Sequence, residues 1–281
     1  MHQDKSIKLS QKTTYRQIQV PSTVFKAYDI RGIIGKELYE DSFYSIGLAL
    51  GYYLSKLQRQ KIVLARDGRI TSPVLALALK QGLLDSGIDV FDIGLVTTPM
   101  MYFATHTKGI DSGVMVTGSH NPINYNGIKI VLSGKTLMQE DIRILYTMIA
   151  EGKRVNGCGK EIELDIMEEY TKRIVSDIQI KRSLKIIVDC GNGTAGLVAP
   201  QVFEKLGCEV IPLYCDVDGR FPNHHPDPTI EDNLVDLKNE VIAQKADLGF
   251  AFDGDADRLG LVTNTGETIH PDRLMMLYAR E

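Results

Sequence analysis

The clearest pattern along the chain is a short apolar run, then a polar turn, then an amphipathic stretch. Residues 61–65 are mostly apolar and end at the polar turn 66–69, which predicts a buried strand followed by a loop. Ser72 is placed to cap a helix and Pro73 to begin it, so the pattern predicts a helix from there to about residue 86. Gly87 ends this helix, and residues 88–93 predict the next strand.

The same succession returns about 120 residues later. Residues 184–188 predict a strand, residues 189–193 a turn and residues 197–206 a helix. Gly207 ends that helix, and residues 209–213 predict another strand. The repeat favours duplication of one α/β unit over a chance likeness between ordinary α/β segments.

A second pair of segments supports the duplication. The strands predicted before Thr117-Gly-Ser119 and before Asp253-Gly-Asp255 both run into a loop with a central glycine. In α/β sheets the chemistry gathers in loops beyond the carboxyl ends of strands, where both of these loops are expected. The predicted fold class is α/β, with tandem duplicated α/β domains that have mixed sheets, cut off at the start of a third.

The domain boundaries are predicted from local composition and from glycine-rich polar stretches. A polar leader without periodicity covers residues 1–20, and a polar, glycine-rich stretch at 151–160 separates the two units. We therefore expect a flexible leader over 1–20, a first domain over 21–157, a second over 158–265 and the start of a truncated third over 266–281. The last part is predicted as a helix from Pro271 that stops without a capping glycine.

The overall composition is that of a globular protein. Of 281 residues, 43% are hydrophobic and 24% charged, and the net charge is −4, so neither disorder nor the basic excess of a nucleic-acid or membrane-surface binder is indicated. The four cysteines form no metal-ligand pattern, which favours free thiols in a reducing compartment. No signal peptide or membrane span is found, so we expect a cytoplasmic protein.

An acidic loop is the strongest chemical signal. Asp253, Asp255 and Asp257 stand at alternate positions after an apolar strand. Three carboxylates held close together repel one another unless a cation neutralises them, and their hard oxygen atoms suit Mg²⁺ or Ca²⁺. An EF-hand is excluded, because Arg258 and Asn264 stand where it needs glycine and an acid. A solvated acidic turn and a Mg²⁺-dependent phosphatase with Asp253 as nucleophile remain alternatives.

The loop Thr117-Gly-Ser-His-Asn-Pro122 is the second chemical signal. A serine presented by a glycine after a strand can be a nucleophile or a phosphate carrier, although the hydrolase elbow Gly-x-Ser-x-Gly is absent. His120 is a candidate base or hydrogen-bonding group, and Asn121 a residue that fixes the turn. The plainer interpretation is a capped Ser-His-Asn-Pro turn.

Three further patterns carry less weight. Residues 191–196 satisfy the dinucleotide fingerprint, with Asp216 farther on, but the unit is internal and glycines in such a turn often serve backbone geometry alone. His224 and His225 lie in a proline-rich turn that favours a structured loop over a metal site. Basic residues that phosphate recognition near a metal would need stand beside glycine-bearing turns: Arg31, Lys129 and Arg258.

Taken together, four motifs resemble those of a known family. They are Phe25-Lys-Ala-Tyr-Asp-Ile-Arg-Gly32, Thr117-Gly-Ser-His-Asn-Pro122, Tyr125-Asn-Gly-Ile-Lys129 and Asp253-Gly-Asp-Ala-Asp-Arg258. In this order they resemble the α-D-phosphohexomutase superfamily, most closely its bacterial phosphomannomutase/phosphoglucomutase members. Gly118, where phosphoglucosamine mutases more often have alanine, modestly favours the hexose enzymes.

The resemblance implies phosphoryl transfer between C1 and C6 of a mannose or glucose phosphate, through a phosphoserine and a hexose 1,6-bisphosphate. Ser119 resembles the phosphoserine, and Mg²⁺ is implied as the cofactor, held by Ser119, Asp253, Asp255 and Asp257. The implied catalytic residues are Ser119, His120, Lys129, Arg31 and Arg258, and the implied substrate-binding residues are Tyr28, Arg31, Asn121 and Lys129. Hexose phosphates are the implied partners, with neither nucleic acid nor membrane.

The chain departs from the family pattern at its end. Family members have a sugar-contacting loop of the form Glu-x-Ser-Gly-His and a later phosphate-binding loop, and neither occurs here. We therefore expect a mutase with impaired turnover, or one completed by a separate chain that carries the missing domains, because lost remote contacts cost rate. A non-catalytic fragment is a further alternative.

Overall fold

A computed structural model describes residues 14–280; the first thirteen residues of the predicted leader lie outside the described residues. The strands are β1 (Ile30–Ile33), β2 (Lys61–Arg66), β3 (Asp89–Leu95), β4 (Gly113–Val116), β5 (Tyr125–Leu132), β6 (Lys135–Thr136), β7 (Glu161–Glu163), β8 (Lys185–Asp189), β9 (Glu209–Leu213), β10 (Leu248–Phe252), β11 (Leu259–Thr263) and β12 (Thr268–Ile269). The helices are α1 (Glu40–Lys56), α2 (Ser72–Asp85), α3 (Thr98–Thr107), α4 (Glu140–Ala150), α5 (Met167–Asp177), α6 (Ala199–Lys205), α7 (Val235–Ala243) and α8 (Pro271–Tyr278).

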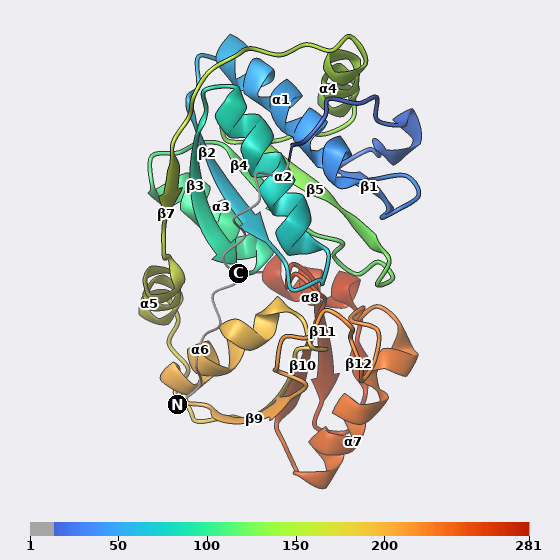
Figure 1. Ribbon diagram of the computed structural model, residues 1–281. Helices are drawn as coiled ribbons and strands as arrows, with labels where there is room; N and C mark the ends of the chain where they lie inside the picture. The colour runs from blue at the N-terminus through green and yellow to red at the C-terminus, as the bar shows by residue number, and fades with distance from the viewer. Residues whose placement is uncertain (1–13, 281) are drawn as a thin grey trace, which may run out of the picture.

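The strands form two mixed sheets that repeat one arrangement (Figure 1). The first sheet has the order β1-β5-β4-β2-β3-β7, with β6 beside β5, and the second has the order β12-β11-β10-β8-β9. In the first, β5 is antiparallel to β4, which is followed by parallel β2 and β3. In the second, β11 is antiparallel to β10, which is followed by parallel β8 and β9. The shared four-strand pattern supports the duplication predicted from the sequence.

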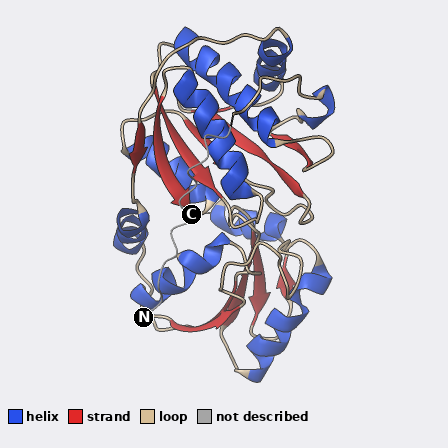
Figure 2. Cartoon of the chain, viewed as in Figure 1, coloured by secondary structure: helices blue, strands red, loops and turns tan. Residues whose placement is uncertain are grey.

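Helices cover both faces of each sheet (Figure 2), as the nearly continuous apolar strands require. On β2, Ile62 and Leu64 pack in the core under α1, α2 and α4, whereas Val63 and Ala65 pack with α3 on the other face. In the second sheet, α7 packs against one face and the α6 side chain Phe203 stacks on Phe250 on the other. The α/β fold class is thereby confirmed.

Two of the predicted boundaries need correction. Residues 14–20 are part of the described fold rather than a loose leader, because Ile18 donates its backbone N–H to Ser45 of α1 and Val20 is buried. Strand β7 pairs with β3, so the first sheet continues past the boundary predicted at residue 157. Gly157 fits closely against Gly87, which lets the chain run along this sheet edge before it leaves the domain. The remaining domain bounds stay a prediction.

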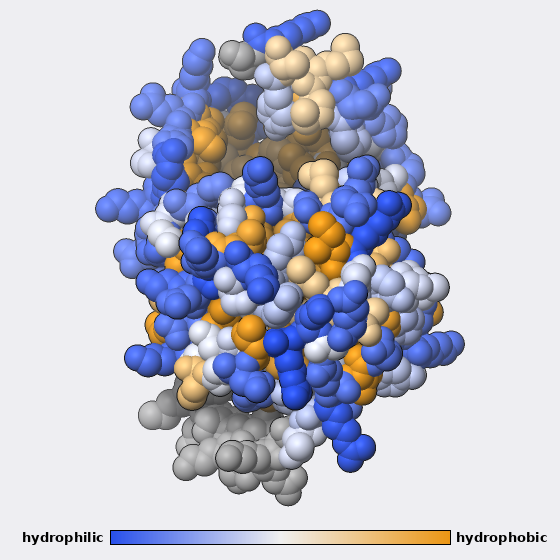
Figure 3. All heavy atoms as spheres, turned by 90° about the horizontal axis from the view of Figure 1, so that it is seen from above, coloured by the Kyte–Doolittle hydropathy of each residue, from blue (hydrophilic) through white to orange (hydrophobic). Residues whose placement is uncertain are grey.

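The predicted elements otherwise agree with the structure to within about two residues. The helix predicted over 197–206 is shorter, because a 3₁₀ turn over Thr194–Leu197 precedes α6. The helix predicted from Pro271 is α8, and its side chains Met275, Leu277 and Tyr278 are more than half exposed. Seen from the α1 and α4 end, hydrophilic side chains cover most of the surface (Figure 3). No helix within residues 14–280 is long and apolar enough to cross a membrane.

Candidate active site

Two loops from different sheets meet at one point. The loop between β4 and β5 carries Ser119, and the loop between β10 and β11 carries Asp253, at corresponding places in the repeated arrangement. Ser119 Oγ donates a hydrogen bond to Asp253 Oδ2 at 3.0 Å. The two motifs are separated by 134 positions in sequence, and the fold brings them into direct contact.

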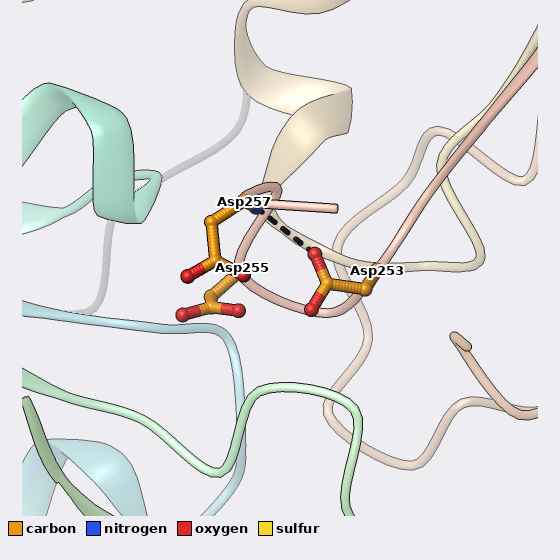
Figure 4. Close-up of side chains that lie close together, drawn as sticks. All are labelled: Asp253, Asp255 and Asp257. Carbon is orange, nitrogen blue, oxygen red and sulfur yellow. Dashed lines mark hydrogen bonds between the residues drawn. The ribbon is translucent and has the colours of Figure 1, made fainter. Parts of the chain in front are cut away.

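The three aspartates of the second loop converge (Figure 4). Asp253, Asp255 and Asp257 each offer a carboxylate oxygen within 4.8 Å of the others. Asp253 is fully buried, and its Oδ1 accepts the backbone N–H groups of Asp257 and Arg258 at 2.9 and 3.0 Å. These bonds fold the loop back on Asp253. The alternation of the acids, together with this turn, directs the carboxylates into one space.

The electrostatics of this cluster are those of crowded like charges. Burial, with the negative charges of Asp255 and Asp257, raises the pKa of Asp253 well above its ordinary value. Lys129 Nζ pairs with Asp255 Oδ2 at 2.6 Å and also with Asp257. Burial alone lowers the pKa of Lys129, but the charges of Asp255 and Asp257 outweigh it and raise that pKa. Lys129 therefore stays protonated and lowers the pKa of the buried Asp255, despite the opposing effect of burial.

The three aspartates offer oxygen donors for a divalent cation, and one of these oxygens has no other partner among the described residues. Asp255 is completely buried, yet its Oδ1 accepts no hydrogen bond within the described structure. A buried carboxylate oxygen without a partner costs free energy, and a hard cation would satisfy it. Carboxylate oxygens are the donors that Mg²⁺ prefers, so these residues fit the ion that the sequence indicates.

The buried ion pair of Asp67 and Arg69 holds the loop over residues 117–122, the serine loop, in place. Ser119 has a backbone φ of 49°, an uncommon conformation for a residue other than glycine. Asp67 accepts hydrogen bonds from Thr117 Oγ1 at 2.8 Å and from Gly118 N at 3.0 Å. Arg69 donates to the carbonyl of Ser119 at 2.7 Å and also to the carbonyls of Asn121, Pro122 and Tyr125. Arg69 Nε lies 3.3 Å from Asp67 Oδ2.

Sequence reasoning missed these supporting residues. The sequence pattern indicates only a polar turn for Asp67 and Arg69, and no role for Thr98. Thr98, at the start of α3, donates its backbone N–H to Asp255 O at 2.9 Å and its hydroxyl to the carboxylate of the same residue. The available signal was their position after β2 and β3, where parallel strands end beside β4.

Gly118 has no room for a side chain, which gives a testable prediction. A Cβ at this position would lie 2.3 Å from Arg69 Nε and 2.4 Å from Arg69 Cζ. We expect Gly118→Ala to lower the free energy of unfolding by about 1–3 kcal/mol, because it displaces the guanidinium from the loop. Urea unfolding of Gly118→Ala, Arg69→Ala and the double variant checks this. The glycine substitution should cost less in the Arg69→Ala background, and equal costs would contradict the clash.

The other predicted site residues lie around the two loops at different distances. Arg31 Nη1 donates to Asn121 Oδ1 at 3.4 Å, and Asn121 in turn closes the serine loop through Gly118 O. His120 Nδ1 is 3.3 Å from Ser119 Oγ. Arg258 Nη1 lies 3.9 Å from Asp227 Oδ1. Tyr28 is 63% exposed and, within residues 14–280, makes no hydrogen bond or ion pair with this group.

The glycine turn 189–196 and the histidine turn serve the site structurally. Gly193 leaves no space for a Cβ, which would approach the backbone of Asp253 and Gly254 to about 3 Å. These contacts support the interpretation that the glycines of the apparent dinucleotide fingerprint serve close packing. His224 Nε2 is 3.0 Å from Asp189 Oδ2, a contact that joins this turn to the end of β8.

The His224–Asp189 pair predicts a pH-dependent stability. Burial lowers the pKa of His224, but Asp189 outweighs it, so the folded-state pKa lies above the unfolded value of 6.5. The ion pair therefore contributes fully below pH 6.5, and its contribution is lost as pH rises through the folded-state pKa. We expect His224→Gln to cost about 1–3 kcal/mol at pH 6 and less at pH 9. Chemical denaturation at both pH values measures this; a loss independent of pH would contradict it.

Comparison with known proteins bears on the same two loops. Two family models match: phosphoglucomutase/phosphomannomutase, alpha/beta/alpha domain I, over residues 22–156, and domain II of the same family over residues 168–266. The chain belongs to the phosphoglucomutase/phosphomannomutase family. The resemblance predicted from the four motifs is thereby confirmed. The first match contains the serine loop and the second contains the acidic loop.

Individual relatives agree with the family assignment. The chain is 49% identical over 269 residues to a phosphomannomutase/phosphoglucomutase of Pseudomonas aeruginosa, with 96% of this chain and 58% of the relative covered. It is 48% identical over 260 residues to a phosphoglucomutase of Neisseria meningitidis, with 92% and 56% covered. A crystal structure of a family protein from Burkholderia thailandensis superposes with a TM-score of 0.90 at 47% identity, covering 92% of this chain and 58% of that one. The chain thus spans little more than half the length of these relatives.

Proposed function

We propose that this chain carries the phosphoryl-donor centre of a hexose phosphate mutase, with Ser119 as the residue that becomes phosphorylated. The observation that carries the proposal is the 3.0 Å contact between Ser119 Oγ and Asp253 Oδ2, which joins the two family motifs in one site. The substrates proposed are a mannose or glucose monophosphate and the corresponding 1,6-bisphosphate. The relatives named above, which are mutases, support this choice.

The proposed cofactor is Mg²⁺, held by Asp253, Asp255, Asp257 and an oxygen on Ser119. The unpartnered Oδ1 of Asp255 and the raised pKa of Asp253 support it. When bound, the ion would neutralise negative charge on the transferring phosphoryl group.

The protein groups have distinct proposed roles in the transfer. Ser119 Oγ attacks the phosphorus of the bisphosphate, a new O–P bond forms, and the bond from phosphorus to the sugar oxygen breaks. His120 is neutral at pH 7, because burial and the positive charges of Arg258 and Arg31 lower its pKa to about 4, and its Nδ1 is placed to accept the serine proton. Lys129 is protonated before the transfer and supplies its proton to the departing sugar oxygen. In the reverse step, the phosphoserine gives its phosphoryl group to the free hydroxyl of a bound monophosphate and so forms the bisphosphate. The bisphosphate then turns round in the site, and the phosphate at its other end is transferred to Ser119.

Positive groups around the serine would stabilise and orient the substrate. Arg31 and Arg258 are placed to balance charge on the phosphoryl group, since loose phosphoryl-transfer transition states depend mainly on positioning and electrostatics. Asn121 holds both the serine loop and Arg31 in register. Tyr28 is proposed to contact the sugar from the exposed loop before β1.

A single-turnover experiment tests the proposal. The protein is mixed with glucose 1,6-bisphosphate labelled in phosphorus, with and without Mg²⁺, and the products are separated. We expect one hexose monophosphate released for each phosphoryl group bound to protein, only with Mg²⁺. Release of inorganic phosphate without labelled protein would instead support the phosphatase alternative, which none of the comparisons supports.

A further inference from the structure

Two cysteines meet beside the site although they are far apart in sequence. Cys190 directly follows β8, and Cys215 lies just beyond the end of the neighbouring parallel strand β9. Cys190 N donates to Leu213 O at 3.0 Å, which fixes the register at this end of the sheet. The two Sγ atoms are 3.3 Å apart, and both thiols are free. Cys190 is buried, whereas Cys215 is partly exposed.

We propose that Cys190 and Cys215 are an oxidisable pair that forms an intrachain disulfide on exposure to a hydroperoxide. The sulfurs need to approach by only about 1 Å to reach bonding distance, which side-chain rotation can supply. The β8–β9 pairing ends at Asp189 and Leu213, one and two residues before the two cysteines, and so holds the two chain segments side by side. The pair cannot be recognised from a sequence motif. The two residues are brought together by adjacent strands and not by a Cys-x-x-Cys turn.

The surroundings assign different roles to the two thiols. The hydrogen bond with Cys190 lowers the pKa of Cys215, although burial opposes this, so Cys215 is the better thiolate. The same hydrogen bond, together with burial, raises the pKa of Cys190, which keeps its proton. The partly exposed, more acidic sulfur is the one that an oxidant in solution reaches first.

The oxidation balances in two steps. The Cys215 thiolate attacks one peroxide oxygen, the O–O bond breaks, and Cys215 sulfenic acid and hydroxide form. Cys190 then attacks the sulfenic sulfur, the S–S bond forms, and the S–O bond breaks. The departing hydroxide takes up the proton that Cys190 loses, so hydrogen peroxide oxidises two thiols and yields two waters. A dithiol reductant reverses the change by thiol–disulfide exchange.

The pair borders the turn that supports the acidic loop. Thr194 donates its backbone N–H to Gly254 O at 3.1 Å, and a Cβ at Gly196 would overlap the carbonyl of Cys215. A disulfide would therefore shift the turn that packs against Asp253 and Gly254. We expect oxidation to weaken Mg²⁺ binding at the acidic loop about fivefold or more, a step that rests on the proposed function.

Peptide mapping tests the disulfide directly. The reduced protein is treated with one to a few equivalents of hydrogen peroxide, alkylated and digested. We expect a linked peptide pair containing Cys190 and Cys215, formed before the exposed Cys158 is oxidised and removed by dithiothreitol. In Cys190→Ser, Cys215 should stop at a sulfenic acid that dimedone traps; in Cys215→Ser, neither product should form. Oxidation of Cys158 while the pair stays reduced, or a disulfide to Cys208, would overturn the proposal.

Magnesium titration of the reduced, oxidised and re-reduced protein tests the coupling. We expect weaker binding only in the oxidised sample, with full recovery on reduction and no change in the Cys190→Ser variant after the same treatment. Equal affinities in all three samples would overturn the coupling. A reduced protein that does not bind Mg²⁺ would overturn the proposed function and the coupling together, and would leave the mapped disulfide standing.

Discussion

Replacing Arg69 by methionine is expected to lower the free energy of unfolding by about 3–5 kcal/mol, because the change leaves the Asp67 carboxylate buried without its charge partner. Both side chains are almost fully buried, with exposures of 1% and 2%. The substitution also removes the donors that bind the carbonyl groups of the serine loop. Urea unfolding followed by circular dichroism measures the loss.

A matched substitution elsewhere separates this effect from a general loss of charge. Arg59 pairs with Asp111 at 2.8 Å, but their side chains are 44% and 40% exposed. Arg59→Met should therefore cost less than about 1 kcal/mol, as is usual for solvated ion pairs. If the two methionine variants lose similar stability, Arg69 does not support the loop in the way described.

Replacing Asp255 by asparagine is expected to weaken Mg²⁺ binding on the order of 100-fold, because it removes one of three converging negative charges and replaces a carboxylate oxygen by a neutral amide oxygen. Asp255 is fully buried, and its Oδ1 has no hydrogen-bond partner in the described structure. Isothermal titration calorimetry with MgCl₂ measures the affinity. The Mg²⁺-induced rise in melting temperature should fall in parallel, since a ligand stabilises only the state that binds it.

The control for Asp255→Asn is a second aspartate changed in the same way. Asp218 is partly exposed and pairs with Arg220 in its own loop. Asp218→Asn makes the same change in net charge, and we expect it to leave Mg²⁺ affinity unchanged. Equal weakening in both variants would point to a general electrostatic effect and against a site formed by the three acids.

Much of the fold could be predicted because its signals are local. Apolar runs, a proline at a helix start and glycines at helix ends located β2, α2 and β3 to within about two residues. The edge strand β7 could not be found in this way. Its three residues, Glu161, Ile162 and Glu163, have one apolar side chain among them, and they pair with β3, which lies about 70 positions earlier in the sequence. The docking of residues 14–20 on α1 is likewise a long-range contact without a local pattern.

In the candidate site, too, the residues with a local sequence signal could be predicted and those that depend on long-range contacts could not. Ser119 and the three aspartates stood out because unusual polar residues follow apolar strands. Asp67, Arg69 and Thr98 look like ordinary turn and cap residues in the sequence. They gain their roles only when β2, β3 and β4 end side by side and bring the turns together. The contact between Ser119 and Asp253 required the two repeated units to face one another, which no spacing in the sequence specifies.

Identification of the phosphorylated residue tests the central claim most directly. The folded protein is incubated with glucose 1,6-bisphosphate and Mg²⁺, and its mass and peptides are compared with those of Ser119→Ala. The proposed site predicts one phosphoryl group on Ser119 and none in the variant. A phosphoryl group on Asp253, or none on a folded protein that has bound Mg²⁺, would contradict the proposal that the two loops form a phosphoryl-donor centre.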